Sequence, residues 1–324
     1  MTKKMYELLI FYLEADMKKQ STPAADERYT RTDLACEWGR ATDEGEEGIQ
    51  RTSERLSFGI RHTLRILNAL AARRIGRPMG EYITLCCDPM WKLDPTKQQA
   101  LEGTVASCLL DLLARQTEGK ETRDLSVMVV GLGNREITAD AVGPLAVDAL
   151  IVTRHLKDHE PEIFRGMACC AVSALAPGVL GQTGMEIAEI VAGAARRCSP
   201  DAIIVIDALA ARSCDRLAAT VQLTDTGISP GSGVGNDRCA LTSDTMGVPV
   251  IALGVPTVVD SSTLVYDALA QAGIEQVDER LRKILENGRR FYVSPKEADV
   301  ITERTAKILA HAINRALVGV ASLG

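Results

Sequence analysis

Two aspartates are the residues of this sequence best placed to do chemistry. Asp207 directly follows the apolar run 203–206, and Asp140 follows the apolar run 126–130 after a glycine turn. In open α/β sheets, ligands bind at the carboxyl ends of the strands, so two carboxylates at such ends can face one crevice. Each aspartate taken alone could equally cap the helix that follows its strand. Their joint placement predicts that Asp140 and Asp207 form a catalytic pair.

Two neighbouring carboxylates support one of two chemistries. They can share a proton and activate water, or they can bind a metal ion that activates it. No histidine lies between residues 160 and 310, where the later strands end, and the four in the chain are His62, His155, His159 and His311. His155 and His159 share a helix face in a charged stretch, which is typical of a solvated helix end. We therefore expect a proton-sharing pair, in which one charge raises the pKa of the other carboxyl, with no metal and no other cofactor.

Other nucleophile and nucleotide motifs are incomplete. The turn Gly131-Leu132-Gly133-Asn134 departs from the dinucleotide-binding GxGxxG pattern because Glu136 occupies the third glycine position. The glycine-rich loop at 230–236 lacks the Gly-Lys-Ser/Thr ending of a phosphate-binding loop. It either lets a substrate backbone approach Gly233 and Gly235 closely or simply connects two strands. No GxSxG elbow is present.

An α/β fold must position these residues. From residue 126 onward, apolar runs typical of strands alternate with segments of helical periodicity. Strands are predicted at 82–85, 126–130, 167–172, 202–206, 218–223 and 249–253. Helices are predicted at 98–116, 142–156, 185–197 and 295–317. We expect a mostly parallel central sheet flanked by helices. The acidic, glycine-interrupted stretch 36–60 is typical of a solvated loop or edge.

Composition and charge exclude several classes of protein. The chain has 324 residues, 46% of them hydrophobic and 25% charged, which is enough for a full core. Its formal net charge of −6 argues against binding to a nucleic-acid backbone. No apolar stretch is long enough to span a bilayer, no signal peptide is recognisable, and the cysteines have no CxxC spacing. We expect a cytoplasmic enzyme with free thiols.

Several motifs occur in an order that resembles one known family, the spore germination proteases. They include Gly131-Leu132-Gly133-Asn134, Thr138-Ala139-Asp140-Ala141-Val142-Gly143-Pro144, Ile206-Asp207-Ala208-Leu209-Ala210-Ala211-Arg212-Ser213 and Gly254-Val255-Pro256-Thr257-Val258-Val259-Asp260. The resemblance runs from about Arg31 to Glu297, with residues 36–80 matching poorly. It implies a fold similar to hydrogenase-maturation protease/phosphorylase-like folds.

The resemblance also implies an activity. Members of this family are aspartic-type endopeptidases that are made as zymogens and degrade the small acid-soluble proteins coating spore DNA. The family's two proposed catalytic aspartates fall on Asp140 and Asp207. A homotetramer is implied, located in the cytoplasm of the developing spore and in the spore core.

A processing site follows from the same resemblance. The family cleaves after an acidic residue and before an apolar residue followed by alanine, and Arg31-Thr32-Asp33-Leu34-Ala35 resembles that pattern. We predict self-cleavage between Asp33 and Leu34, which makes residues 1–33 a propeptide arm. Residues 34–324 then form a single α/β peptidase domain with inserted elements at about 36–100. Arg212 and Arg238 are candidates for a cationic pocket that binds the acidic residue.

Two alternatives stay open from the sequence. A glycine turn with a strand-end aspartate is also similar to metal-dependent hydrogenase-maturation endopeptidases, which would change the cofactor but not the reaction class. The glycine loops alternatively fit a nucleotide-binding regulatory module, which would not cleave peptides at all.

Overall fold

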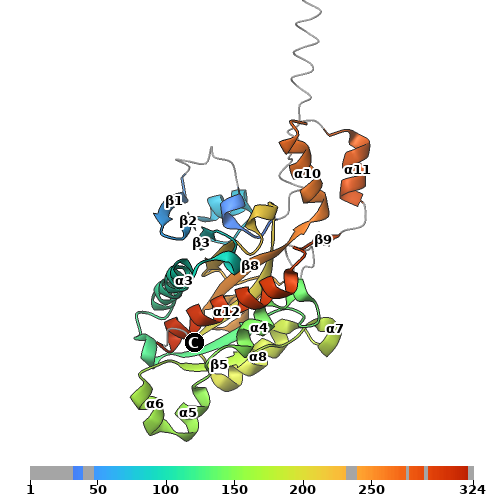
Figure 1. The fold of residues 1–324 in the computed structure, drawn as a ribbon. Helices are drawn as coiled ribbons and strands as arrows, with labels where there is room; N and C mark the ends of the chain where they lie inside the picture. Colours follow the sequence, from blue (N-terminus) through green and yellow to red (C-terminus); the bar gives the residue numbers. More distant parts are fainter. Residues whose placement is uncertain (1–31, 39–46, 231–238, 275–276, 288–290, 320–324) are drawn as a thin grey trace, which may run out of the picture.

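One mixed β-sheet organises the molecule (Figure 1). The computed structural model describes residues 32–38, 47–230, 239–274, 277–287 and 291–319. Within these ranges, nine strands form the sheet in the order β1-β2-β3-β7-β8-β6-β4-β5, and β9 pairs with β8 beside this path. The strands are β1 (Ile49–Leu56), β2 (Gly59–Ile66), β3 (Gly80–Cys87), β4 (Ser126–Gly131), β5 (Ala171–Leu175), β6 (Ala202–Ala211), β7 (Thr220–Thr224), β8 (Val250–Asp260) and β9 (Tyr292–Val293).

Helices cover the sheet and fill its connections. The α-helices of the described ranges are α2 (Ala69–Ile75), α3 (Pro95–Gln116), α4 (Val142–Asp148), α5 (Arg154–His159), α6 (Pro161–Met167), α7 (Leu180–Thr183), α8 (Ile187–Cys198), α9 (Ser243–Met246), α10 (Ser261–Gln271), α11 (Glu279–Asn287) and α12 (Ala298–Leu317). Short 3-10 turns include η1 (Ala35–Glu37), η3 (Met90–Lys92), η4 (Thr122–Asp124), η5 (Thr138–Asp140) and η6 (Cys214–Arg216). None of the helices in these ranges is both long enough and apolar enough to cross a membrane.

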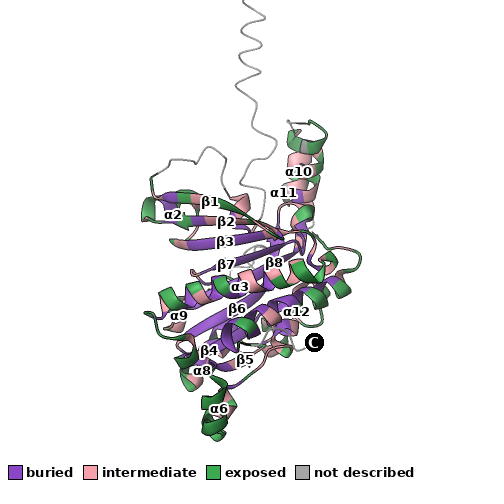
Figure 2. Ribbon diagram, turned by 60° about the vertical axis from the view of Figure 1, so that its left-hand side comes forward, coloured by how far each residue is buried: buried purple, intermediate pink, exposed green. Residues whose placement is uncertain are grey.

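Strands β5, β4, β6 and β8 form the parallel part of the sheet. Successive side chains of a strand point to opposite faces, so both faces must be covered. On one face, Val127 and Ile204 pack with α3, α4 and α12. On the other face, Met128 and Ile203 pack with α8. Figure 2 shows these central strands as buried between the helices. The predicted α/β class, with helices flanking a central sheet, is confirmed.

Strands β7, β3, β2 and β1 extend the sheet as an antiparallel part. β7 pairs with β8 on one side and with β3 on the other, so the change of direction falls between β8 and β7. Residues 49–56, expected to be a loop or an edge, form the edge strand β1. The stretch before Ile49 lies largely outside the described ranges.

Among the predicted elements, one helix is broken and one strand is shifted along the chain in the structure. The helix predicted at 142–156 ends at Asp148, and α5 begins only at Arg154. The break arises because Thr153 is buried and pairs with the chain entering β5: its amide donates to the Val172 carbonyl at 2.9 Å and its hydroxyl to the Cys170 carbonyl at 2.5 Å. The strand predicted at 167–172 is shifted to 171–175, since α6 occupies the chain through Met167.

A long ribbon of β6 and β8 reaches beyond the rest of the parallel part. β4 ends at Gly131, opposite Ile206 of β6, whereas β6 continues beside β8 to Ala211. Asp207 is therefore one residue beyond the end of β4 but inside β6, and the prediction that it ends its strand was wrong. A bulge interrupts the β6–β8 register, leaving Thr257 as the extra residue of β8. Such bulges are common beside active sites.

Candidate active site

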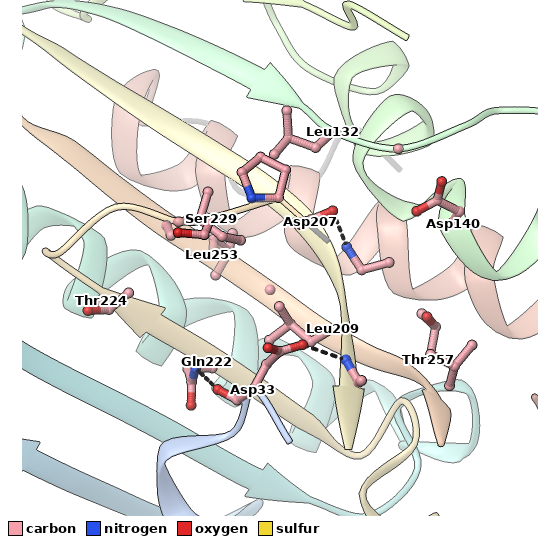
Figure 3. Close-up of a pocket in the computed structure, with 18 of the residues that line it drawn as sticks. Asp33, Leu132, Asp140, Asp207, Leu209, Gln222, Thr224, Ser229, Leu253 and Thr257 are labelled. Carbon is pink, nitrogen blue, oxygen red and sulfur yellow. Dashed lines mark hydrogen bonds between the residues drawn. The ribbon is translucent and has the colours of Figure 1, made fainter. Parts of the chain in front are cut away.

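A cavity of about 720 Å³ lies where the parallel and antiparallel parts of the sheet meet. Its wall includes residues of β6, β7 and β8, the loop after β4, and the N-terminal segment 32–38. Asp140 and Asp207 both line it, and Figure 3 shows their carboxylates among the lining side chains. The structure thus brings the two sequence-predicted acids to one cavity. Pockets that combine apolar walls with a few polar groups are typical of binding sites.

Asp207 is a buried carboxylate with 8% of its surface exposed. It is paired in register with Gly254 of β8, and its Oδ1 accepts a hydrogen bond from the Ala208 amide at 2.9 Å. No helix starts at Asp207, because the chain continues as a strand. The next helical turn, η6, is capped by the Ser213 hydroxyl instead. The reading of Asp207 as a helix cap is therefore wrong.

Asp140 is the last residue of the turn η5, just before α4. Its Oδ2 accepts a hydrogen bond from the Asn134 amide at 2.7 Å, while the cap position of α4 is Ala141, which makes no side-chain cap. The carboxylate thus fixes the loop after β4 rather than the helix. Gly133 is required in this loop, because it has a φ of 115° and a Cβ there would lie 1.9 Å from the Asp140 carbonyl oxygen.

Thr257, the bulged residue of β8, adds a polar group to the cavity wall. The residue is buried, and its hydroxyl has no hydrogen-bond partner within the described parts of the chain. A buried hydroxyl without a partner is costly, so a site for a water molecule or a substrate group fits this position. Sequence reasoning missed Thr257, although it lies in the Gly254–Asp260 motif.

The segment 32–38 forms part of the wall of the same cavity, through Asp33 and Trp38. The Asp33 amide donates to the Ala210 carbonyl at 2.9 Å, and the Ala210 amide donates to the Asp33 carboxylate at 2.9 Å. Leu34 is fully buried among side chains of β6 and β8 that include Leu209 and Val259. Asp33, predicted to be the last residue of the propeptide arm, is bound to β6 through these two hydrogen bonds.

Further contacts hold both ends of this segment. The Glu37 carboxylate accepts hydrogen bonds from the amides of Arg212 at 2.9 Å and Ser213 at 3.3 Å. Arg77 donates to the Thr32 carbonyl at 3.1 Å, and its guanidinium lies 4.4 Å from the centre of the Trp38 ring. Arg77 also lines the cavity, and sequence reasoning missed it because it lies far from the motifs.

The other predicted binding residues fall elsewhere. The Arg212 guanidinium lies 3.6 Å from Asp267, and Arg212 is not among the residues that line the cavity. Arg238, Gly233 and Gly235 lie outside the described residues. These roles therefore stay predictions.

Histidines are placed away from the two acids. His62 contacts Ser53 on the antiparallel part, His311 contacts Glu102 between α12 and α3, and His155 and His159 are exposed on α5. Within the described ranges, no group of three or more His, Cys, Asp or Glu side chains is arranged to hold a metal ion.

Two carboxylates that face a cavity with a stretch of polypeptide bound in its wall define a site of the kind that proteases use. The comparisons with known proteins agree with this class. A family model described as germination protease matches residues 32–275. The chain belongs to the germination protease family and is a protease.

Curated relatives are similar to the chain over most of its length. A germination protease from Caldanaerobacter subterraneus is 40% identical, covering 85% of this chain and 86% of the relative. One from Clostridium acetobutylicum is 38% identical, covering 89% and 94%. One from Halalkalibacterium halodurans is 36% identical, covering 89% and 93%. Among solved structures, the NiFe hydrogenase maturation protease HycI from Thermococcus kodakarensis matches with a TM-score of 0.27 and 15% identity, covering 64% of this chain and 99% of that one.

Proposed function

We propose that this protein is an aspartic-type endopeptidase that processes itself and then initiates degradation of small acid-soluble, DNA-coating spore proteins during germination. Family membership supports a germination protease. One structural observation carries the aspartic-type mechanism: Asp140, Asp207 and Asp33, which precedes the proposed cleavage point, all line the same cavity.

The proposed chemistry follows from two carboxylates sharing one proton. The ionised member accepts a proton from a water molecule as the water attacks the carbonyl carbon of Asp33. The protonated member supplies a proton to the Leu34 nitrogen as the peptide bond breaks. Neither carboxylate is acylated, and the products are a new carboxylate and a new amine. The buried setting of Asp207 suits such a pair, since both groups need to be held away from bulk water.

The zymogen model explains why Asp33 lies in the wall of the cavity. While the Asp33 carboxylate is bound to the Ala210 amide, the acidic residue of a protein substrate cannot take the same position. Cleavage after Asp33 would free residues 1–33 and open that position to an acidic residue of a spore protein. A homotetramer and a location in the cytoplasm of the developing spore and the spore core belong to this proposal through the family resemblance.

A pair of matched peptides tests the proposal in trans. The first carries Arg-Thr-Asp-Leu-Ala, the sequence of residues 31–35, and the second has alanine in place of aspartate. After incubation of the full-length protein, we expect cleavage of the first peptide between aspartate and leucine and little cleavage of the second, measured by mass spectrometry. Equal cleavage of both peptides, or of neither, would contradict the proposed specificity.

A further inference from the structure

Gln222 is a buried amide side chain at the centre of β7. The residue is 7% exposed and is paired in register with Thr84 of β3 on one side and Gly254 of β8 on the other. Its neighbours Val221 and Leu223 are fully buried. A carboxamide in such a position needs its hydrogen bonds satisfied, because an unpaired buried polar group is strongly unfavourable.

The Gln222 carboxamide spans the Asp33–Leu34 peptide bond. Its Nε2 donates to the Asp33 carbonyl oxygen at 2.7 Å (Figure 3). Its Oε1 accepts from the amide of Ala35, one residue beyond that bond, at 2.5 Å. One side chain therefore holds the backbone on both sides of the proposed cleavage point, in the way a neighbouring strand would.

The orientation of this carboxamide is fixed by its partners. Oxygen and nitrogen of a glutamine side chain are assigned from their hydrogen-bond networks. The Oε1 atom faces two donors, the Ala35 amide and the Thr84 hydroxyl at 3.4 Å. The Nε2 atom consequently points at the Asp33 carbonyl oxygen, which can only accept.

The Asp33 side chain explains why its carbonyl is directed at Gln222. In a regular ladder, the Ala210 amide would bind a main-chain carbonyl of the next strand. Here the Asp33 carboxylate accepts from that amide, while the Asp33 amide donates to the Ala210 carbonyl. The Asp33 carboxylate thus completes the bridge to β6. The main-chain carbonyl of Asp33 accepts instead from Gln222 of β7, on the other wall of the cavity.

We propose that Gln222 polarises the scissile carbonyl and stabilises the oxyanion formed on it. The inference deepens the proposed function and rests on it. When water adds to the Asp33 carbonyl carbon, the electron pair of the C=O bond moves onto oxygen, where the Nε2–H group already donates. When the C–N bond breaks, that oxygen regains its double bond. After processing, Gln222 offers the same donor to the carbonyl of a substrate residue whose acidic side chain binds the Ala210 amide.

The proposal is tested on the full-length chain by the first-order rate at which it converts to a chain starting at Leu34. Loss of one oxyanion donor typically slows catalysis by about 10²–10³-fold, so we expect Gln222→Met to lose roughly that much. Gln116→Met, at the end of α3 and away from the cavity lining, is the matched control and should process at the wild-type rate. Thermal unfolding of each variant shows that the fold is retained.

Gln222→Glu separates a chemical role from a structural one. An ionised carboxylate cannot donate to the carbonyl, but a protonated one can, so the rate of Gln222→Glu relative to Gln222→Met should rise as the pH falls below about 5. A ratio that stays flat across pH would overturn the proposal, as would Gln222→Met processing within a few-fold of the wild type. A wild-type chain that never yields Leu34 as its first residue would instead refute the proposed function itself.

Discussion

The parallel and antiparallel parts of the sheet contribute different things to the cavity. The parallel part supplies the acids: Asp207 lies inside β6, and Asp140 lies in the loop after β4. The antiparallel part supplies Gln222 of β7, which holds the peptide segment that contains Asp33. The acids thus come from one side of the change in strand direction, whereas the segment is held from both sides, by Ala210 of β6 and Gln222 of β7. A site of this kind is complete only when β8, β7 and β6 are assembled.

The largest expected effect comes from removing an acid of the parallel part. Asp140→Asn or Asp207→Asn should reduce cleavage of the Arg-Thr-Asp-Leu-Ala peptide by about 10³-fold or more, because an amide can neither accept the proton of water nor share one. Initial rates by liquid chromatography measure this. Asp111→Asn, on the exposed side of α3, is the control that should keep wild-type activity. Near-normal rates in either active-site variant would show that the acids of the parallel part do not carry the cleavage.

Changing Asp33 tests the bridge between the segment 32–38 and β6. Asp33→Ala removes the acceptor that binds the Ala210 amide, so we expect self-processing to slow by about tenfold or more, in line with the loss of a charge-assisted hydrogen bond of about 1.5–3 kcal/mol. Asp33→Asn keeps a carbonyl acceptor and should lose less. Conversion is followed by gel densitometry over time. Faster processing of Asp33→Ala than of Asp33→Asn would show that the bridge to β6 is not what positions the bond.

Leu34 tests whether the segment contributes to stability. Because it is fully buried beside Leu209, Leu34→Ala should lower the free energy of unfolding by about 2–5 kcal/mol. The measurement is urea denaturation in an Asp207→Asn background, which keeps the chain uncut. Met79→Ala, at an exposed apolar side chain, serves as the reference and should change it by less than about 0.5 kcal/mol. Equal effects would mean that the segment is not packed into the core.

The smallest expected effect concerns Cys86, whose reactivity depends on its contact with Cys36 of the segment 32–38. A hydrogen bond from the Cys36 thiol, opposed by burial and helped by Arg216, lowers the pKa of Cys86 from 9.0 to about 7. Arg216 Nη1 lies 2.9 Å from its sulfur. Since a depressed pKa favours the thiolate, Cys86 should be alkylated by iodoacetamide increasingly as the pH rises through about 7. It should lose this reactivity as the pH falls below that value.

Cys214 is the internal reference for this measurement. It is an exposed residue, and partial desolvation of its thiol, together with the charges of Asp215 and Asp267, raises its pKa. Peptide mapping at pH 7.5 should therefore find Cys86 alkylated before the more exposed Cys214. The pH profile of Cys86 should move upward in Cys36→Ala, which lacks the donor. If the wild type and Cys36→Ala gave identical pH profiles for the alkylation of Cys86, the reactivity of Cys86 would not depend on Cys36 of the segment 32–38.

The two parts of the sheet also differ in how far the sequence predicts them. Continuous apolar runs in the sequence predicted the parallel part, and the position of Asp140 and Asp207 after two of these runs predicted the catalytic pair. The strand-end assignment of Asp207 was wrong because the extension of β6 depends on its pairing with β8, which no local pattern encodes. The cap interpretations were also wrong, since both carboxylates bind loop or strand amides.

The position of the segment 32–38 could not be predicted from the sequence, because its contacts are long-range. Asp33 and Ala210 are 177 positions apart, and Gln222 and Asp33 are 189 apart. A signal did exist for Gln222: it is a polar residue between Val221 and Leu223 in a predicted strand. Buried polar residues in apolar strands need hydrogen-bond partners, so the sequence indicates that Gln222 binds a polar group.

In the proposed mechanism, acids of the parallel part cut the Asp33–Leu34 bond, which is held by Ala210 of β6 and Gln222 of β7. Intact-mass measurement of full-length wild-type protein and of Asp207→Asn, incubated side by side, tests this mechanism. We expect the wild type to lose the mass of residues 1–33 and to begin at Leu34, whereas Asp207→Asn keeps its full mass. A wild-type product that begins at another residue, or equal conversion of the two proteins, would contradict it.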